Sequence, residues 1–142
     1  MIISSKKIFI GSSLFFAFMD RANLNHAKAI EIVEFLAHQK YQVYTSEIVV
    51  FQTFNAIERD LGSTMVTEFL QAILESSIQI LYSSEADLLA AYRYIKANPG
   101  HQNPLPSIVN ANLMQKNDIS SILTFDFWPN IMGTTISKLV TA

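Results

Sequence analysis

The sequence predicts a single α/β domain with a mostly parallel central sheet of four to five strands flanked by helices. Short runs of β-branched and aromatic residues alternate with segments of helical periodicity along all 142 residues, and half of the residues are hydrophobic while 15% are charged. Strands separated by helices pair in parallel through right-handed crossovers. Because a chain of this length can bury one core without disulfides or metal, residues 1–142 are expected to form one domain.

Five segments have the composition of strands, since they are short, apolar and rich in β-branched or aromatic residues. The fourth of them ends abruptly on a carboxylate, that of Asp126. The expected strands are residues 7–10, 41–45, 78–82, 121–125 and 135–140.

Six segments between these strands have helical spacing of apolar residues, and capping residues mark several of their ends. Ser46 is an expected N-cap, Gly62 an expected stop, and Ser84 with Asp87 forms a capping-box pattern. The first expected helix starts at residue 12 or 13. The other five span residues 23–38, 47–61, 64–75, 85–97 and 107–116. Their expected core residues are Leu14, Ala17, Phe18, Ala27, Ile30, Val33, Ala37, Val50, Phe54, Ile57, Leu61, Val66, Phe69, Leu70, Ile73, Leu88, Ala91, Tyr92 and Ile95.

Charge and cysteine content narrow the possible classes of function. A formal net charge of -2 creates no field that draws nucleic acid non-specifically. The absence of cysteine excludes a disulfide scaffold and thiolate metal sites, and it fits a cytoplasmic protein. The high apolar content favours a subunit interface.

The N-terminal segment imitates a secretion signal, because Lys6 and Lys7 precede an apolar run that reaches Met19. Gly11 interrupts this run, Asp20 ends it, and no convincing cleavage site follows. The run is also too short to span a bilayer. We therefore expect a cytoplasmic protein without a membrane association.

Asp126 is the first candidate for a functional residue. The carboxyl ends of parallel strands are where open α/β sheets bind ligands, so an acid at such an end is a candidate site residue. For Asp126 taken alone, the simpler interpretation is an aspartate that forms a turn or caps the next segment, which is common. On one helix, Gln52, Asn55 and Arg59 form a polar stripe, for which a solvated helix face is the simpler interpretation.

Several common chemistries have no motif in this sequence. The four glycines are scattered singly, so there is no glycine-rich phosphate loop. A nucleophile elbow and a pair of histidines at ligand spacing are also missing. His26, His38 and His101 are interpreted as surface or helix-end residues.

Four landmarks across nearly the whole chain nevertheless resemble PIN domains, the metal-dependent nuclease fold that includes the VapC toxins of bacterial toxin–antitoxin pairs. The resemblance implies a three-layer fold with a mostly parallel sheet. The landmarks are Ile8–Ser13, Asn25-His26 with Ala29, Thr45-Ser46 through Gln52 to Gly62, and Pro106–Met114 followed by Ile122–Asp126.

The same resemblance implies a site in which three or four acids hold Mg²⁺ or Mn²⁺ while RNA is cut. This chain keeps only Asp126 as a catalytic and metal-binding acid. The other positions fall on Gly11, on Gln52 and on Ser107 or within a residue of it. Four other acids do not replace the missing ones, because their expected places in the helices and loops lie off the site; these are Asp20, Glu47, Glu58 and Asp118.

The sequence therefore predicts a degenerate PIN domain that has little or no nuclease activity and no cofactor, since one carboxylate with an amide and a hydroxyl binds Mg²⁺ poorly. The alternative is a weakly active Mg²⁺- or Mn²⁺-dependent ribonuclease that acts as a toxin. As a binding module, the chain is expected to form a homodimer, engage an antitoxin-like protein, or bind RNA weakly. The RNA contacts would be Ser12, Gln52, Arg59, Asn110 and Thr124.

Overall fold

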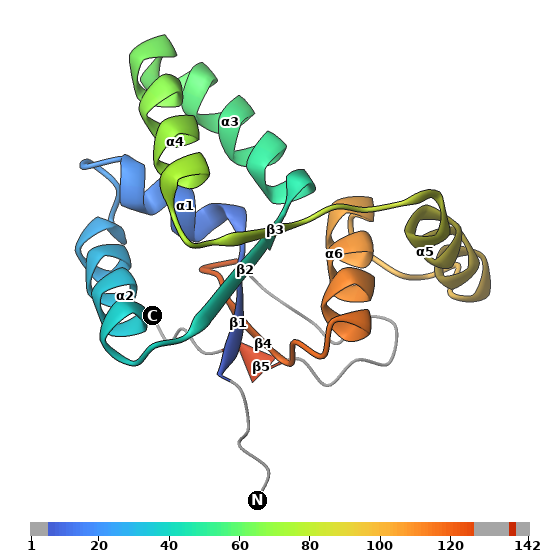
Figure 1. Cartoon of the computed structure of the whole chain (residues 1–142). Helices are drawn as coiled ribbons and strands as arrows, with labels where there is room; N and C mark the ends of the chain where they lie inside the picture. Colours follow the sequence, from blue (N-terminus) through green and yellow to red (C-terminus); the bar gives the residue numbers. More distant parts are fainter. Residues whose placement is uncertain (1–5, 127–136, 139–142) are drawn as a thin grey trace, which may run out of the picture.

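Figure 1 shows the computed structural model, which describes residues 6–126 and 137–138. All strand pairs are parallel, and the sheet has the order β3-β2-β1-β4-β5. The predicted parallel sheet is thus confirmed. Its strands are β1 (Lys7–Ile10), β2 (Gln42–Ser46), β3 (Gln79–Leu81), β4 (Ser121–Leu123) and β5 (Ser137–Lys138).

Six helices cover the sheet as two layers (Figure 1). The chain steps from β1 to β2 to β3 and then crosses back to β4, so right-handed crossovers place α1 to α4 on one face and α5 and α6 on the other. The result is the expected three-layer arrangement. The helices are α1 (Ser12–Met19), α2 (His26–His38), α3 (Glu47–Leu61), α4 (Ser63–Glu75), α5 (Glu85–Ala97) and α6 (Leu105–Lys116).

The central strand β1 organises the core. Ile8 and Phe9 are fully buried because β2 and β4 flank the strand and helices cover both of its faces. Phe15 of α1 meets Phe69 of α4 edge to face, with 5.9 Å between ring centroids. Buried residues from β1, β4, α1, α4 and α6 form one continuous cluster.

The ends of α3 follow the predicted capping residues. The Ser46 hydroxyl accepts a hydrogen bond from the backbone amide of Val49 at 3.1 Å, and Gly62 ends the helix with φ 95° and ψ 175°. Only glycine adopts this backbone conformation without strain. The core faces of α3 and α4 agree with the expectation, with Val50, Ile57 and the predicted residues of α4 buried or partly buried.

Gly62→Ala is expected to lower the free energy of unfolding by about 1 kcal/mol or more, because alanine is strained at this φ although open space surrounds the site. Chemical denaturation measures the change. Gly100→Ala is the matched control, since Gly100 also faces open space but has no positive φ. Equal stability of the two variants would contradict the backbone argument.

The predicted inner face of α2 is mostly wrong, although Ile30 is partly buried. Val33 is 38% exposed and Ala27 and Ala37 are exposed, whereas Ala29 and Leu36 are buried. The helix carries two offset apolar stripes, and periodicity alone cannot choose between them. Packing on α1 covers only one of the two.

The predicted inner face of α5 is also partly wrong. Ala91 is buried and Ile95 is packed against the core, but Leu88 and Tyr92 are 54% and 56% exposed. Asp87, which is buried, takes the inward position one turn before Ala91.

In α1, Leu14 and Ala17 are buried as expected, whereas Phe18 is only partly buried.

A buried carboxylate attaches α5 to α6. Asp87 accepts hydrogen bonds from the Ser84 backbone amide at 2.7 Å and from the Asn112 side chain at 2.8 Å, and it forms an ion pair with Lys116 at 2.8 Å. Burial raises the pKa of the Asp87 carboxyl, but the contacts with Lys116 and Ser84 outweigh it and leave this pKa below its ordinary value.

One predicted strand falls partly outside the described residues. The last predicted strand, 135–140, is described only as β5, and the rest of that segment lies beyond what the structure describes. Among the helices that the structure describes, none has the length and hydropathy needed to cross a bilayer.

Candidate functional site

The candidate site lies where the order of the strands reverses. β1 pairs with β2 on one side and with β4 on the other, so the point at which the chain switches sides lies between β1 and β4. In open α/β sheets, ligands bind in the crevice outside the carboxyl ends of such strands. The chain leaves β1 into Ser12 and leaves β4 into Asp126.

A chain of hydroxyl groups joins these two strand ends. The Ser13 and Thr124 hydroxyl oxygens are 2.8 Å apart, and the Ser13 hydroxyl also accepts a hydrogen bond from the Phe125 amide at 2.8 Å. The Asp126 amide donates to the Thr124 hydroxyl at 3.1 Å. These bonds fix the residues after β4 against the start of α1, so the place of Asp126 is set by local hydrogen bonds.

A pocket of about 400 Å³ opens at this point. Its wall combines hydroxyls, amides and two phenylalanine rings from α1, the segment before α2, α3 and the end of β4. The lining residues are Ser12, Ser13, Phe16, Asn23, Asn25, Gln52, Thr53, Ala56, Phe125 and Asp126. Asp126 is the one carboxylate among these described lining residues.

Gly11 occupies a tight position at the end of β1. Its amide donates to the Leu123 carbonyl at 3.0 Å, and a Cβ placed on it would lie 3.2 Å from both Cβ and Oγ1 of Thr124. The backbone conformation is extended, with φ -88°, so it would accept any residue. A side chain here therefore requires Thr124 to move by a few tenths of an ångström.

Of the predicted site residues, the pocket brings together Ser12, Gln52 and Asp126. Asn110 is buried and accepts a hydrogen bond from the Ser46 hydroxyl at 2.6 Å, which ties α6 to the end of β2. Thr124 is buried beneath Asp126. Both residues support the pocket without lining it.

Two predicted residues lie apart from the pocket wall. Ser107 stands one helical turn before Asn110, at the start of α6. Arg59 lies seven residues beyond Gln52 on α3, about 10 Å along the helix. It is bound to Asp60 at 2.8 Å, and this hydrogen bond and the charge of Asp60 raise the pKa of Arg59.

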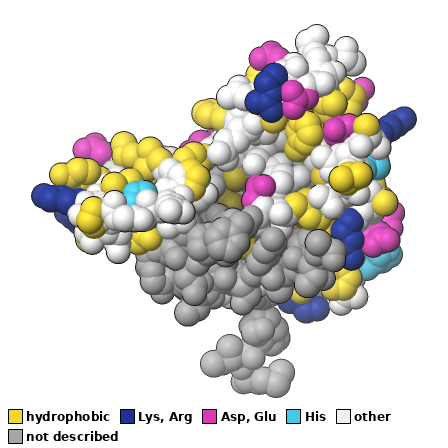
Figure 2. Space-filling view, turned by 180° about the vertical axis from the view of Figure 1, so that it is seen from behind, with side chains coloured by type: hydrophobic (Ala, Val, Ile, Leu, Met, Phe, Trp, Pro, Cys, Tyr) yellow, Lys and Arg dark blue, Asp and Glu magenta, His cyan; other side chains and the backbone are white. Residues whose placement is uncertain are grey.

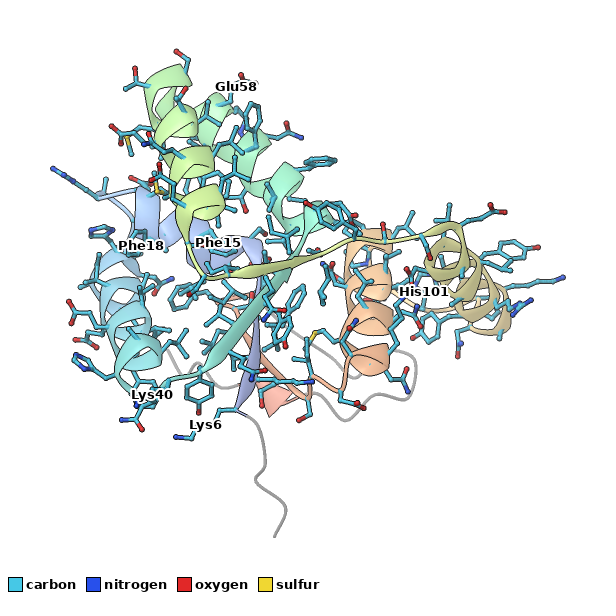
Figure 3. All side chains as sticks on the ribbon, in the orientation of Figure 1. Lys6, Phe15, Phe18, Lys40, Glu58 and His101 are labelled. Atoms are coloured by element: carbon cyan, nitrogen blue, oxygen red, sulfur yellow. The ribbon has the colours of Figure 1, made fainter. Side chains whose placement is uncertain are left out.

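The acids considered as replacements have other places. The Ser83 amide, beyond the end of β3, donates one bifurcated hydrogen bond to the two oxygens of the Glu47 carboxylate, at 2.7 and 3.0 Å. Figure 3 shows Glu58 toward the far end of α3, away from the sheet. Neither residue lines the pocket.

The residues of this site do not fit the metal centre that the resemblance implies. Among the described residues, no three His, Cys, Asp or Glu side chains lie close enough to hold one ion. A hard cation such as Mg²⁺ is bound through carboxylates, and the pocket wall provides one. The chemistry that the wall provides instead is hydrogen bonding by neutral groups.

Seven of the ten lining residues were not predicted as site residues: Ser13, Phe16, Asn23, Asn25, Thr53, Ala56 and Phe125. Asn25 stood in one of the four landmarks, which was a usable signal. Asn23 carried none, because its place depends on a turn in which its side chain accepts a hydrogen bond from the Asn25 amide at 2.8 Å.

No family model and no curated protein matches the chain. Several solved structures match most of it, three of them as follows. VapC20 from Mycobacterium tuberculosis, a toxin that cleaves the sarcin-ricin loop, has a TM-score of 0.73 at 18% identity and covers 84% of this chain and 89% of its own. VapBC2 from Rickettsia felis, bound to a promoter DNA fragment, has a TM-score of 0.71 at 12% identity over 94% and 99%.

The third, FitAcB from Neisseria gonorrhoeae, has a TM-score of 0.65 at 14% identity and covers 92% of this chain and 95% of that chain. At identities this low, the structural matches establish the fold alone. The strand order, the layers and these matches agree with the four landmarks of the sequence. The chain therefore has the VapC-like PIN-domain fold.

Proposed function

We propose that this protein is a degenerate PIN domain that has lost nuclease activity and acts as a binding module. The observation that supports the proposal is the pocket between β1 and β4, whose described wall contains Asp126 as its one carboxylate. Gln52 provides a carbonyl oxygen but no negative charge. Such a wall neither holds a divalent cation firmly nor activates water through it.

The test is an RNA cleavage assay on the purified chain with Mg²⁺ and with Mn²⁺. We expect no cleavage of single-stranded RNA above the level of the Asp126→Asn variant. Metal-dependent cleavage that disappears in Asp126→Asn would instead establish the alternative, a weakly active ribonuclease.

A protein partner is the binding function that the surface favours most. An apolar groove of about 560 Å³ runs between α1, α2 and α4, and its wall includes Leu14, Phe18, Val33, Phe69 and Ile73. Figure 3 labels Phe15 and Phe18, which extend from α1 into this groove. We propose that it receives an apolar segment of an antitoxin-like protein, since the matched structures include the VapBC2 and FitAB assemblies.

A second apolar surface supports the expected homodimer. In Figure 2, hydrophobic side chains gather over α5 at the left of the view. Leu88 and Tyr92 lie one turn apart on this helix, and Leu88 lines a hollow together with Ile48 and Leu105. Phe51, which is 65% exposed, follows Ile48 by one turn of α3. Exposed apolar groups gathered in this way are typical of a subunit interface.

We expect gel filtration with light scattering to give the mass of a dimer for the natural chain and of a monomer for the double variant Leu88→Glu, Tyr92→Glu, because two charges would be buried in the interface. Leu74→Glu is the control, since Leu74 is an exposed leucine of α4. A monomeric natural chain, or a dimer that survives the double variant, would contradict this interface.

RNA is the less favoured ligand class. Arg59 lies outside the pocket wall, and no described lining residue is a lysine or an arginine. Phosphate groups would meet the negative charge of Asp126 without a counter-charge. Any contact with RNA would therefore have to use its bases.

A further inference from the structure

We propose that the pocket between β1 and β4 binds an unpaired guanine base. The proposal rests on the proposed loss of metal binding at this site, and it assigns the site a ligand that needs no metal. It is based on the chemistry of the ten described lining residues, which combine one carboxylate, neutral amide and hydroxyl groups, and two aromatic rings.

Charge excludes the simplest alternatives. The described wall holds the Asp126 carboxylate and no cation, so an anionic ligand such as phosphate is repelled. A small cation is poorly served by one carboxylate. Asp126 favours a ligand that presents hydrogen-bond donors, and the neutral amide and hydroxyl groups of the described wall favour one that is itself neutral and polar.

Several polar groups of the wall are available to a ligand. Within residues 6–126, the side chains of Ser12, Asn25 and Gln52 make no hydrogen bond, and the Asn23 amide group uses only its oxygen. Asp126 accepts only a long contact, 3.5 Å from the Thr124 hydroxyl. The Ser13 and Thr53 hydroxyls, by contrast, are already engaged by Thr124 and the Val49 carbonyl.

The aromatic residues add a preference for a flat ligand. Phe16 from α1 and Phe125 from the end of β4 both line the pocket and are partly buried. Neither ring is paired with another aromatic ring among the described residues. Unstacked bases are commonly bound by stacking on phenylalanine and by hydrogen bonds along their Watson–Crick edge.

Among the bases, guanine matches this set of groups best. A carboxylate only accepts hydrogen bonds, and guanine presents two adjacent donors, N1–H and the N2 amino group, along one edge. Its O6 and N7 atoms are acceptors, which amide NH₂ groups of Gln52 and Asn25 can satisfy. A glutamate at position 52, which the resemblance implies, would offer no hydrogen-bond donor to a base. Gln52 offers one, so the same replacement that weakens a metal site favours the binding of a base.

The volume also agrees with a base or nucleoside. A pocket of about 400 Å³ is within the range of small-ligand sites, and it is open to solvent on one side. The ribose and any phosphate would then point outward, away from Asp126. The base could therefore belong to a free nucleoside or to a single-stranded RNA, and the experiment has to separate these two sources.

The test is calorimetric titration of the full chain with guanosine and with inosine, which lacks the N2 amino group, in the presence of a chelator. We expect guanosine to bind about tenfold more tightly than inosine, because one good bidentate contact discriminates by about this factor or more. Asp126→Asn should remove this difference. Gln52→Ala is a second variant, in case Asp126→Asn perturbs the segment after β4. Gln52 is exposed on α3, and its replacement should weaken guanosine binding.

Glu58→Gln is the matched control, since it removes a carboxylate from the same helix outside the pocket and should leave guanosine binding unchanged. A uridine oligonucleotide carrying one guanosine is compared with free guanosine. Tighter binding of the oligonucleotide identifies RNA as the source of the base, and equal binding identifies the free nucleoside.

Equal affinity for guanosine and inosine, no binding of guanosine, or equal binding of an oligonucleotide without guanine would overturn the proposal. Such a result would leave the proposed loss of nuclease activity in place, because that loss is tested by metal-dependent cleavage. Cleavage by the natural chain would conversely overturn the proposed function whatever guanosine does.

Discussion

The triple variant Gly11→Asp, Gln52→Glu, Ser107→Asp is expected to bind Mn²⁺ and to cleave single-stranded RNA, whereas the natural chain does neither. Gln52 and Asp126 already line one pocket, and Gly11 adjoins Thr124 at its base. Carboxylates at positions 11 and 52 would add oxygen ligands and negative charge at this pocket, and position 107 is changed because the resemblance places an acid there or within a residue of it. Calorimetry with Mn²⁺ and an RNA cleavage assay measure the gain.

The variant Gly11→Asn, Ser107→Asn, which keeps Gln52, is the matched control. It fills the same space without charge and should remain inactive. Gly11→Ala measures the steric cost alone, since any Cβ at this position presses on Thr124 at 3.2 Å. If the acidic variant folds and binds no Mn²⁺, the pocket is not a decayed metal centre.

Asp87→Asn is expected to lower the free energy of unfolding by about 3 kcal/mol. The Asp87 side chain is 1% exposed, and the substitution leaves the Ser84 amide, the Asn112 side chain and Lys116 with a poorer acceptor that carries no charge. Lys116 is 49% exposed, so water screens its share of the ion pair. Urea denaturation measures the loss, and Glu85→Gln in the first turn of the same helix should cost only a few tenths of this.

The contribution of Asp87 should also depend on pH. Its pKa in the folded protein lies below the ordinary value of 3.8, so the carboxylate stabilises the fold above that pH and the effect is lost as pH falls through the folded pKa. The difference in unfolding free energy between the natural chain and Asp87→Asn should be constant from neutral pH to about 5 and shrink below 3.8. A difference that persisted in strong acid would contradict the role of its charge.

Local sequence signals predicted the parts of the fold in which one residue decides the outcome. Ser46 and Gly62 set the ends of α3 because capping and positive φ depend on their own chemistry. The faces of α2 and α5 were predicted partly wrongly because each helix packs mainly against one other helix. Neighbour packing, which periodicity does not contain, decided which side chains were covered.

The candidate site was predictable to a similar extent. Asp126 could be placed because it follows a strand whose carboxyl end lies at the edge where such sheets bind ligands, and Gln52 because the resemblance puts a site residue at this position of its helix. Asn23 and Phe16 could not be placed, since one belongs to an irregular turn and the other to an almost wholly apolar helix. Their place in the wall depends on how α1 and α2 pack together.

The most direct test of the central claim is a Mn²⁺ titration of the natural chain by calorimetry, with the triple acidic variant as the reference. Because the pocket presents one carboxylate, we predict binding that is millimolar or weaker in the natural chain and clearly tighter in the variant. Micromolar binding by the natural chain, abolished by Asp126→Asn and accompanied by RNA cleavage, would contradict the account.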